Sequence, residues 1–238
     1  AIQTHGVSCC LLQPRLQNPT GAIMTESRGK QLLEIAEKRN VFLVEDDVYG
    51  ELLEPEARPR QLRDHDDIGR VVTCSSFSKV LAPGARVGWI VAPEPIRARI
   101  RRAAAGLSVA SPTLEQMVIS EYLSEGRFDR YLRSLRSQID GDVERYSASV
   151  QRHFPSECRF SAPTGGVLLW IELPEGISGT TLYHRAFEAG ISIVPGAAFT
   201  TTNDFDSFFR LSCTVPFSES VDAGIRKLGE LIAASEDF

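Results

Sequence analysis

One lysine, Lys79, lies between two apolar segments, with hydroxyl side chains just before it and an arginine shortly after it. The two segments, 71–74 and 87–91, are predicted to be short buried strands, because they are β-branched or aromatic and lack helical spacing. An apolar environment at a strand end favours the neutral amine of a lysine, and a neutral amine attacks carbonyl groups. Lys79 is therefore a candidate for a Schiff base with a carbonyl compound.

The polar side chains near Lys79 suit a phosphate group. Ser76 and Ser78 can donate hydroxyl hydrogen bonds, and Arg86 can bind phosphate oxygens with its two-pronged guanidinium. A compound with both a carbonyl and a phosphate fits the description of pyridoxal 5'-phosphate. The alternative is a surface lysine in a polar loop, with the arginine paired to a nearby acid, and a short motif does not decide between them.

Two earlier apolar segments also end in polar clusters. Segment 7–12 is a near-continuous apolar run, typical of a parallel strand covered on both faces, and it leads to Asn18 in a turn. Segment 41–44 is predicted to be a second buried strand, and it leads to Asp46 and Tyr49. A helical pattern separates the two, so the three elements are expected to form a right-handed βαβ unit.

The carboxyl ends of neighbouring parallel strands meet at one edge of a sheet, where ligands bind. We therefore expect Asn18, Asp46 and Lys79 to face one crevice. A carboxylate facing the nitrogen of a pyridoxal ring keeps it protonated, so that the ring accepts electrons, and Asp46 suits this task. Asn18 and Tyr49 can donate to the phenolic oxygen of the ring, and Arg210, on a later predicted strand, can bind a substrate carboxylate.

Each of these residues also has a simpler interpretation. Asn18 precedes a proline and can open an ordinary turn, and Asp46 and its neighbour Asp47 can be loop acids or helix caps. Tyr49 can belong to the core, and Arg210 can pair with an acid on its strand. The occurrence of all of them at successive strand ends favours the site.

Four blocks of this sequence resemble fold type I, aminotransferase-like proteins that use pyridoxal phosphate. The blocks are Gln-Asn-Pro-Thr-Gly at 17–21, Glu-Asp-Asp-Val-Tyr-Gly-Glu-Leu at 45–52, the segment 75–89, and Phe-Arg-Leu at 209–211. The amino-acid sequences of the second and third blocks most resemble those of the MocR branch of the GntR-type transcription regulators, which carry an N-terminal winged helix-turn-helix. The resemblance covers essentially the whole chain, in the order of the family.

The resemblance implies a role for each matching residue. Lys79 becomes the Schiff-base lysine, Asp46 the partner of the ring nitrogen, and Asn18 and Tyr49 the partners of the phenolic oxygen. Ser76, Ser78 and Arg86 become phosphate ligands, and Arg210 becomes the carboxylate anchor. The Asn-Pro bond of the family is sometimes cis, which stays open for Asn18–Pro19. The resemblance also implies an amino acid or amine as effector or substrate, and a homodimer.

The fold class expected is α/β: a partial parallel-sheet large domain of the pyridoxal-phosphate-dependent transferase fold, followed by a small α+β domain. The proposed division is 1–145, including a bridging helix, and 146–238. Helices are predicted over 25–39, 93–106 (with Pro95 near its first turn), 113–124, 128–154, 181–188 and 219–234. Later strands are predicted over 166–173, 191–194 and 208–213.

Composition excludes several other classes of protein. The chain has 238 residues, with 42% hydrophobic and 24% charged, which is ordinary for a globular protein. A formal net charge of -5 does not indicate binding to nucleic acid or membrane through a basic surface, so DNA would be bound only through an absent N-terminal domain. The five cysteines form no C-x-x-C pair, and we expect them to be reduced, three of them in strand cores, in a cytoplasmic protein. The histidines show no metal spacing, and no segment is long enough to span a membrane.

Two functions remain open at this point. The first is the effector-sensing domain of a GntR/MocR-type regulator, and the second is a free-standing aminotransferase that acts on an α-amino acid. A third possibility is a fold remnant without activity of its own. The family supplies a glycine-containing phosphate turn and an aromatic ring stacker from residues that precede the Asn18 block, and neither occurs upstream here. We therefore expect this chain to be part of a longer one.

Overall fold

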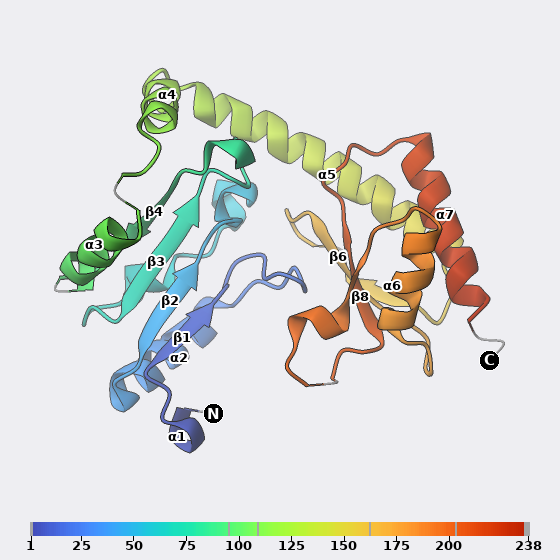
Figure 1. Ribbon diagram of the computed structural model, residues 1–238, viewed down its shortest axis with the longest axis horizontal. Helices are drawn as coiled ribbons and strands as arrows, with labels where there is room; N and C mark the ends of the chain where they lie inside the picture. The colour runs from blue at the N-terminus through green and yellow to red at the C-terminus, as the bar shows by residue number, and fades with distance from the viewer. Residues whose placement is uncertain (1, 95, 109, 162, 203, 236–238) are drawn as a thin grey trace. The chain divides into compact units, whose positions relative to one another are not determined.

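The computed structural model describes residues 2–94, 96–108, 110–161, 163–202 and 204–235, and the statements below concern these residues (Figure 1). The chain forms two compact units. Unit 1 comprises residues 1–15 and 23–134, and unit 2 comprises residues 16–22 and 135–238. The division therefore falls inside a long helix and places the loop 16–22 with the C-terminal residues. The sequence-based division after residue 145 stays a prediction.

Unit 1 is built on a four-stranded sheet. Its strands are β1 (Cys9–Leu12), β2 (Phe42–Asp46), β3 (Val71–Ser76) and β4 (Gly88–Val91), in the order β1-β2-β3-β4. The first three are parallel, and β4 runs antiparallel to β3. The strands that lead to the predicted site residues are therefore neighbours, as the sequence analysis required.

Helix α2 (Glu26–Arg39) connects β1 to β2 and begins where the sequence predicts. The Thr25 side chain caps it by accepting from the Arg28 N–H, and Asn40 ends it in the left-handed conformation. A small core joins this helix to the sheet and comprises Ala36, Val41, Leu43, Leu62 and Val71. Leu62 opens η3 (Leu62–His65), which follows the short turns η1 (Gly50–Leu52) and η2 (Pro55–Ala57). The segment 58–67 thus carries one 3-10 turn that packs on the core.

The burial predicted for two strands is wrong. The Leu11 side chain of β1 is 73% exposed, Cys9 is also exposed, and all four residues of β4 are exposed. These strands lie at the two edges of the described sheet, whereas β2 and β3 lie in its middle. An edge strand is covered by fewer neighbours than a central strand, so its apolar sequence does not by itself make it buried.

Three helices follow the sheet, and their bounds agree closely with the predicted ones. They are α3 (Ile96–Leu107), α4 (Thr113–Ser124) and α5 (Arg127–His153), whereas the short α1 (Ile2–His5) was not predicted. Pro95, which we expected near the start of α3, lies outside the described residues. The apolar stripe of α4 is exposed at Leu114, Met117 and Val118.

Unit 2 is a small α+β unit. Its antiparallel sheet has the order β5-β6-β8-β7, with strands β5 (Arg159–Ser161), β6 (Leu168–Glu172), β7 (Val194–Pro195) and β8 (Phe208–Ser212). Helices α6 (Gly179–Glu188) and α7 (Glu219–Ala233) accompany it, and η5 (Gly196–Phe199) follows β7. The short β5 was not predicted, and of the strand predicted over 191–194 only the end is formed.

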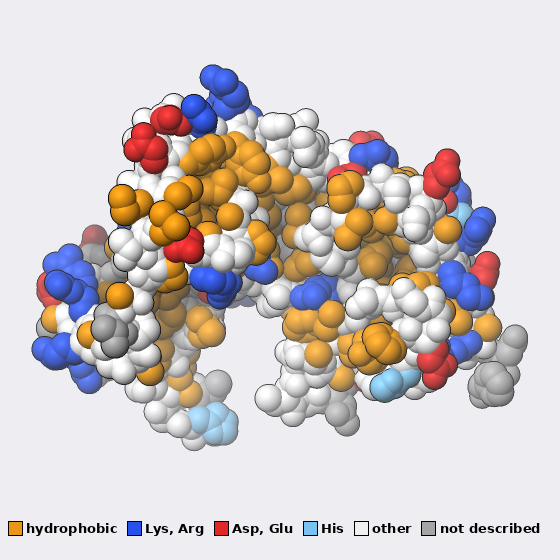
Figure 2. All heavy atoms as spheres, turned by 45° about the horizontal axis from the view of Figure 1, so that its top comes forward, with side chains coloured by type: hydrophobic (Ala, Val, Ile, Leu, Met, Phe, Trp, Pro, Cys, Tyr) orange, Lys and Arg blue, Asp and Glu red, His pale blue; other side chains and the backbone are white. Residues whose placement is uncertain are grey.

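The interior of unit 2 is almost entirely apolar. Its core cluster comprises Val143, Tyr146, Val150, Leu169, Ile171, Leu173, Ile177, Leu182, Ala186, Ile193, Phe209, Leu211, Cys213, Ile225, Leu228 and Ile232. The three residues from α5, at 143, 146 and 150, recur at the three- and four-residue spacing of one helical face. Figure 2 shows acidic and basic side chains scattered among apolar ones over the face in view. None of the helices in the described ranges has the length and apolarity that a membrane crossing requires.

Candidate functional site

The carboxyl end of β2 carries Asp46, whose side chain is half-buried. Burial raises the pKa of this carboxyl group above its ordinary value, while the Val48 N–H and the Lys79 ammonium act in the opposite direction. The Val48 N–H donates to Asp46 Oδ1 at 3.2 Å, and Gln13 Nε2 lies 3.4 Å from Oδ2. The end of β2 therefore presents an acid whose ionised form gains from a cationic partner.

Lys79 follows β3, in the turn that begins at Phe77. Its ammonium lies 5.9 Å from the ring centre of Tyr49 and close enough to Asp46 to act on its charge. The amine, the acid and the phenol predicted from the sequence are thus together in unit 1. The prediction of an apolar environment for Lys79 is wrong, because its side chain is exposed. The next residue, Val80, is 2% exposed and packs into the interior instead.

The three predicted phosphate ligands also lie together. Arg86 Nη1 is 3.4 Å from Ser78 Oγ and 3.3 Å from the Pro83 carbonyl oxygen, and the Ser78 N–H donates to Ser76 Oγ at 3.3 Å. Arg86 has a positive φ of 53°, directly after η4 (Pro83–Ala85). This turn folds the arginine back over the serines, so two hydroxyls and one guanidinium share a small region at the end of β3.

The remaining two predicted residues, Asn18 and Arg210, meet in unit 2. Arg210 Nη1 donates to Asn18 Oδ1 at 2.9 Å, and the guanidinium carbon lies 5.3 Å from the ring centre of Phe199. Arg210 Nε is buried and has no hydrogen-bond partner among the described residues. The simpler interpretation of Arg210, a salt bridge with an acid, is therefore not what these residues form. The Asn18–Pro19 peptide bond is cis.

The structure thus gathers the predicted residues into two groups. One group lies in unit 1 at the ends of β2 and β3, and the other lies in unit 2 at β8 and the loop 16–22. The loop that carries Asn18 follows β1 in the chain, but it packs with unit 2, where Gly21 approaches Pro163. The convergence of Asn18 with Lys79 stays a prediction.

A buried ion pair beside the site was not predicted from the sequence. Arg15 Nε donates to Asp47 Oδ1 at 2.6 Å, Arg15 Nη2 pairs with Asp47 Oδ2, and Gln61 Nε2 donates to Oδ2 at 2.6 Å. Glu45, which is 1% exposed, accepts from the Leu62 N–H and from the Thr73 hydroxyl. The alternation of side chains along β2 could have indicated that Glu45 and Asp47 are buried. Residues 43, 45 and 47 lie on one face of the strand, and residue 43 is an apolar leucine.

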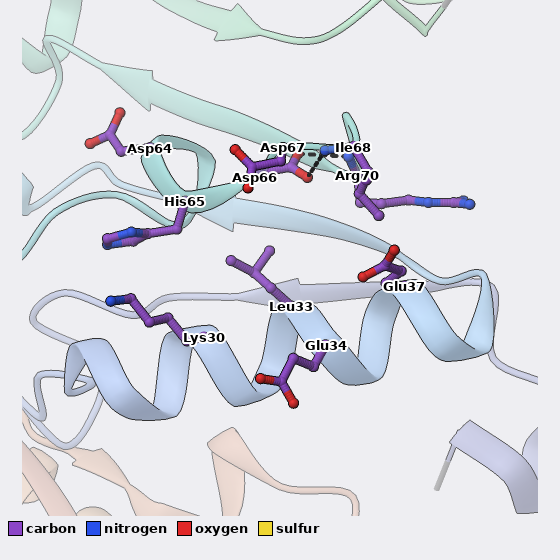
Figure 3. Close-up of a pocket in the computed structure, with 10 residues that line it drawn as sticks. All are labelled: Lys30, Leu33, Glu34, Glu37, Asp64, His65, Asp66, Asp67, Ile68 and Arg70. Carbon is purple, nitrogen blue, oxygen red and sulfur yellow. Dashed lines mark hydrogen bonds between the residues drawn. The ribbon is translucent and has the colours of Figure 1, made fainter.

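A separate cavity of about 430 Å³ lies on unit 1 between α2 and the segment 64–70. Figure 3 shows Lys30 and His65 at one end of it, and Asp66 turned toward the backbone of its own loop. The Asp66 carboxylate accepts from the N–H groups of Ile68, Arg70 and Val71. Asp66 therefore holds the loop that enters β3, and we assign no ligand to this cavity.

Comparison with known proteins identifies the family of this chain. The family model described as aminotransferase class I and II matches residues 2–228. The chain belongs to this family. Among solved structures, the kynurenine aminotransferase of Pyrococcus horikoshii, solved with PMP, superposes with a TM-score of 0.92 and 30% identity over 98% of this chain and 58% of that one.

Two kinds of curated relative match this aminotransferase-family chain. The HTH-type transcriptional regulator YjiR of Escherichia coli is 32% identical over 98% of this chain and 49% of its own length. The 2-aminoadipate transaminase of Thermus thermophilus is 35% identical over 93% of this chain and 56% of its own length. The chain therefore spans about half the length of the curated relatives it matches, and both a regulator and enzymes are among them.

Proposed function

We propose that this chain is the pyridoxal-phosphate-binding, aminotransferase-like effector domain of a GntR/MocR-type transcription regulator. The observation that carries the proposal is the grouping of Lys79, Asp46 and Tyr49 beside the cluster of Ser76, Ser78 and Arg86. The similarity to regulators such as YjiR over 98% of this chain favours the regulatory setting. DNA would be bound by a separate winged-helix domain, because this chain has a formal net charge of -5.

The donor set fits the proposed cofactor. Ser76, Ser78 and Arg86 supply two hydroxyls and one guanidinium, which is the chemistry that holds a phosphate. Asp46 supplies an acid whose raised pKa falls again when a cation such as a protonated ring nitrogen faces it. Tyr49 and Asn18 supply donors for the phenolic oxygen. When bound, the cofactor supplies an electron sink for the α-carbon of an amino compound.

In this proposal Lys79, Arg210 and Asn18 have separate roles. Lys79 would hold the cofactor at its carbonyl carbon, and, once the amine of the ligand has displaced it there, the lysine amine could carry a proton to or from the α-carbon of the ligand. Arg210 binds the α-carboxylate, and its Nε, for which the described residues supply no partner, provides a donor for the second oxygen. Asn18 Oδ1 accepts from Arg210, which orients the guanidinium. The ligand proposed is therefore an amino acid or a related amine.

Two further parts of the proposal follow from the family. We propose a homodimer, because the family completes its sites with a second subunit, and a cytoplasmic location, because a regulator acts where the chromosome is. The exposed apolar stripe of α4 and the exposed strand β4 are candidates for the surfaces that the rest of a dimer covers.

A free-standing aminotransferase is the second candidate. A 2-aminoadipate transaminase that is 35% identical to this chain favours it. The pair of Arg210 and Asn18 fits both candidates, since an enzyme needs a carboxylate anchor as much as a sensor does. The two candidates differ in turnover: a sensor binds the amino compound without completing the exchange of its amino group, whereas an enzyme forms the keto acid.

The test uses the full-length protein and pyridoxal phosphate. Lys79→Ala is expected to abolish the visible absorbance of the lysine-bound cofactor, whereas Lys38→Ala, at an exposed lysine of α2, leaves it unchanged. Arg210→Ala is expected to keep that absorbance and to lose the spectral response to α-amino acids. An unchanged spectrum for Lys79→Ala would refute the proposal, and loss of both signals in Arg210→Ala would assign Arg210 a structural role.

A further inference from the structure

The face of β2 opposite Asp46 carries a layer of buried polar groups. Residues 43, 45 and 47 alternate onto this face, and their exposures are 0%, 1% and 5%. Asp46 lies between them in the chain and points to the other side. The two carboxylates of this layer, Glu45 and Asp47, are therefore one residue away from the proposed cofactor ligand but do not face the cofactor themselves.

The Arg15–Asp47 pair is the centre of this layer. Both side chains are almost fully buried, at 5% and 6% exposure, and they are joined by two parallel N–H···O contacts. Gln61 Nε2 also donates to the carboxylate, and Arg15 Nη1 donates to the Pro59 carbonyl oxygen at 3.2 Å. A bidentate pair in which the arginine and the carboxylate each have one further partner is confined to a narrow range of geometries, so it holds both chain segments in fixed directions.

The backbone of Asp47 links the same pair to β3. The Asp47 N–H donates to the Cys74 carbonyl oxygen at 2.8 Å, and Ser75 Oγ donates to the Asp47 carbonyl oxygen at 3.0 Å. Ser75 immediately precedes Ser76 of the proposed phosphate cluster. The backbone of Asp47 therefore ties the end of β2 to the end of β3, the two strand ends that carry the proposed site, while its side chain ties the same residue to Arg15.

Gly50 shows how closely the turn is packed against the pair. A Cβ atom at this position would overlap with Asp47 Oδ1 and would lie 2.8 Å from Arg15 Nη2. The Gly50 N–H also bonds to the Asp47 carbonyl oxygen at 3.3 Å. Since Gly50 directly follows Tyr49, the absence of a side chain at 50 lets the pair approach the residue that carries the proposed phenol.

We propose that Arg15 and Asp47 are positioning residues, which fix the turn 46–50 so that Asp46 and Tyr49 face the cofactor. This inference rests on the proposed function for the identity of the group that they face. The pair acts through the backbone, because Asp47 is covalently joined to Asp46 and its carbonyl oxygen accepts from Gly50 and Ser75. Neither Arg15 nor Asp47 touches the cofactor in this arrangement.

The experiment compares Arg15→Lys and Asp47→Asn with Arg145→Lys in the full-length protein. Arg145 also pairs with an aspartate, Asp142 at 2.6 Å, but the Arg145 side chain is exposed, unlike that of Arg15. Hydrogen exchange of the amides of 46–50, without cofactor, is expected to quicken about tenfold or more in the first two variants. The dissociation constants of Arg15→Lys and Asp47→Asn for pyridoxal phosphate are expected to be about tenfold higher than that of the wild-type protein. In both variants the visible circular dichroism of the bound cofactor should weaken, while the visible absorbance of the Lys79-bound cofactor remains. Arg145→Lys should leave all of these unchanged.

The outcomes separate positioning from a general loss of stability. Faster exchange throughout unit 1, with an unchanged dichroism signal and dissociation constant, would overturn the inference. If Arg15→Lys and Asp47→Asn do not fold, Gln61→Met keeps the ion pair and removes one of its anchors, and a smaller change in the same readings is expected. A wild-type protein without visible absorbance would refute the proposed function, and the exchange of 46–50 in the cofactor-free protein would still decide whether the pair positions the turn.

Discussion

The two units of this protein are stabilised in different ways. Unit 2 has a large apolar core in which Leu169, Ile171 and Phe209 are fully buried. Unit 1 has a smaller apolar core, a buried polar layer beside it, and most of the exposed large apolar side chains among the described residues. The apolar surface of unit 1 includes β4 and the stripe of α4.

The difference follows from what each unit does in the proposed function. A buried polar layer contributes little net stability, because desolvation offsets much of the attraction between its charges, but it allows few alternative arrangements. Unit 1 carries such a layer directly behind the ends of β2 and β3. Unit 2 contributes one anchor, Arg210, on a strand whose neighbours are held by ordinary apolar packing. The buried polar layer therefore restricts the backbone most strongly at the ends of β2 and β3, where the cofactor is expected.

The largest contrast expected is in thiol reactivity. Burial raises the pKa of the Cys213 thiol in the core of unit 2 to about 12, whereas Cys9 lies exposed on β1. Because the thiolate is the reactive form, alkylation of Cys213 by iodoacetamide at neutral pH should be about a thousandfold slower than that of Cys9. Mass spectrometry of digested samples measures both rates, and comparable rates would show that the core of unit 2 opens readily.

The next contrast is between two apolar side chains on strands. Phe209→Ala, in the core of unit 2, is expected to lower the free energy of unfolding by about 3–5 kcal/mol, because it removes a fully buried ring and leaves a cavity. Leu11→Ala, on the exposed side of β1, should change it by about 0.5 kcal/mol or less. Trp89 and Trp170 lie in different units, so Trp89→Phe and Trp170→Phe backgrounds let fluorescence follow each unit in urea. A large loss for Leu11→Ala would show that Leu11 is covered in the full-length protein.

The smallest effect expected concerns the polar layer of unit 1 and pH. Burial raises the pKa of Glu45, the bonds from the Leu62 N–H and the Thr73 hydroxyl lower it, and the charge of Asp47 raises it further. A carboxyl group with a raised pKa is ionised less readily in the folded state, so stability falls as pH rises from the ordinary glutamate pKa through the raised one. Each pH unit within that window costs about 1.4 kcal/mol.

Glu45→Gln removes this part of the pH dependence. Relative to wild type, the variant should gain stability as pH rises through the window, and urea unfolding at a series of pH values measures the difference. Glu34→Gln, at an exposed glutamate of α2, is the control and should follow wild type. A difference between Glu45→Gln and wild type that does not vary with pH would show that Glu45 ionises normally in the folded protein.

Local patterns were enough to predict the order and type of nearly all the elements, and the grouping of the site in unit 1. Lys79, Asp46 and Tyr49 each follow an apolar strand, and parallel strands that are neighbours bring their ends together. These features depend on residues close in the chain, whose periodicity is visible in the sequence. Burial was predicted less well, because Leu11, Trp89 and Lys79 depend on how many neighbours cover a strand or a turn, and apolar character does not report that.

Only the tertiary structure decided the polar partners. Arg15 and Asp47 are 32 residues apart, and Arg210 and Asn18 are 192 residues apart. The sequence around a charged residue does not indicate which distant residue it will pair with, and an arginine next to a turn is usually solvated. Burial excludes water from these side chains, and each must then bond to whichever polar group the fold brings near it. The sequence by itself determined which polar residues lie at the strand ends, and packing determined which distant groups hold them in place.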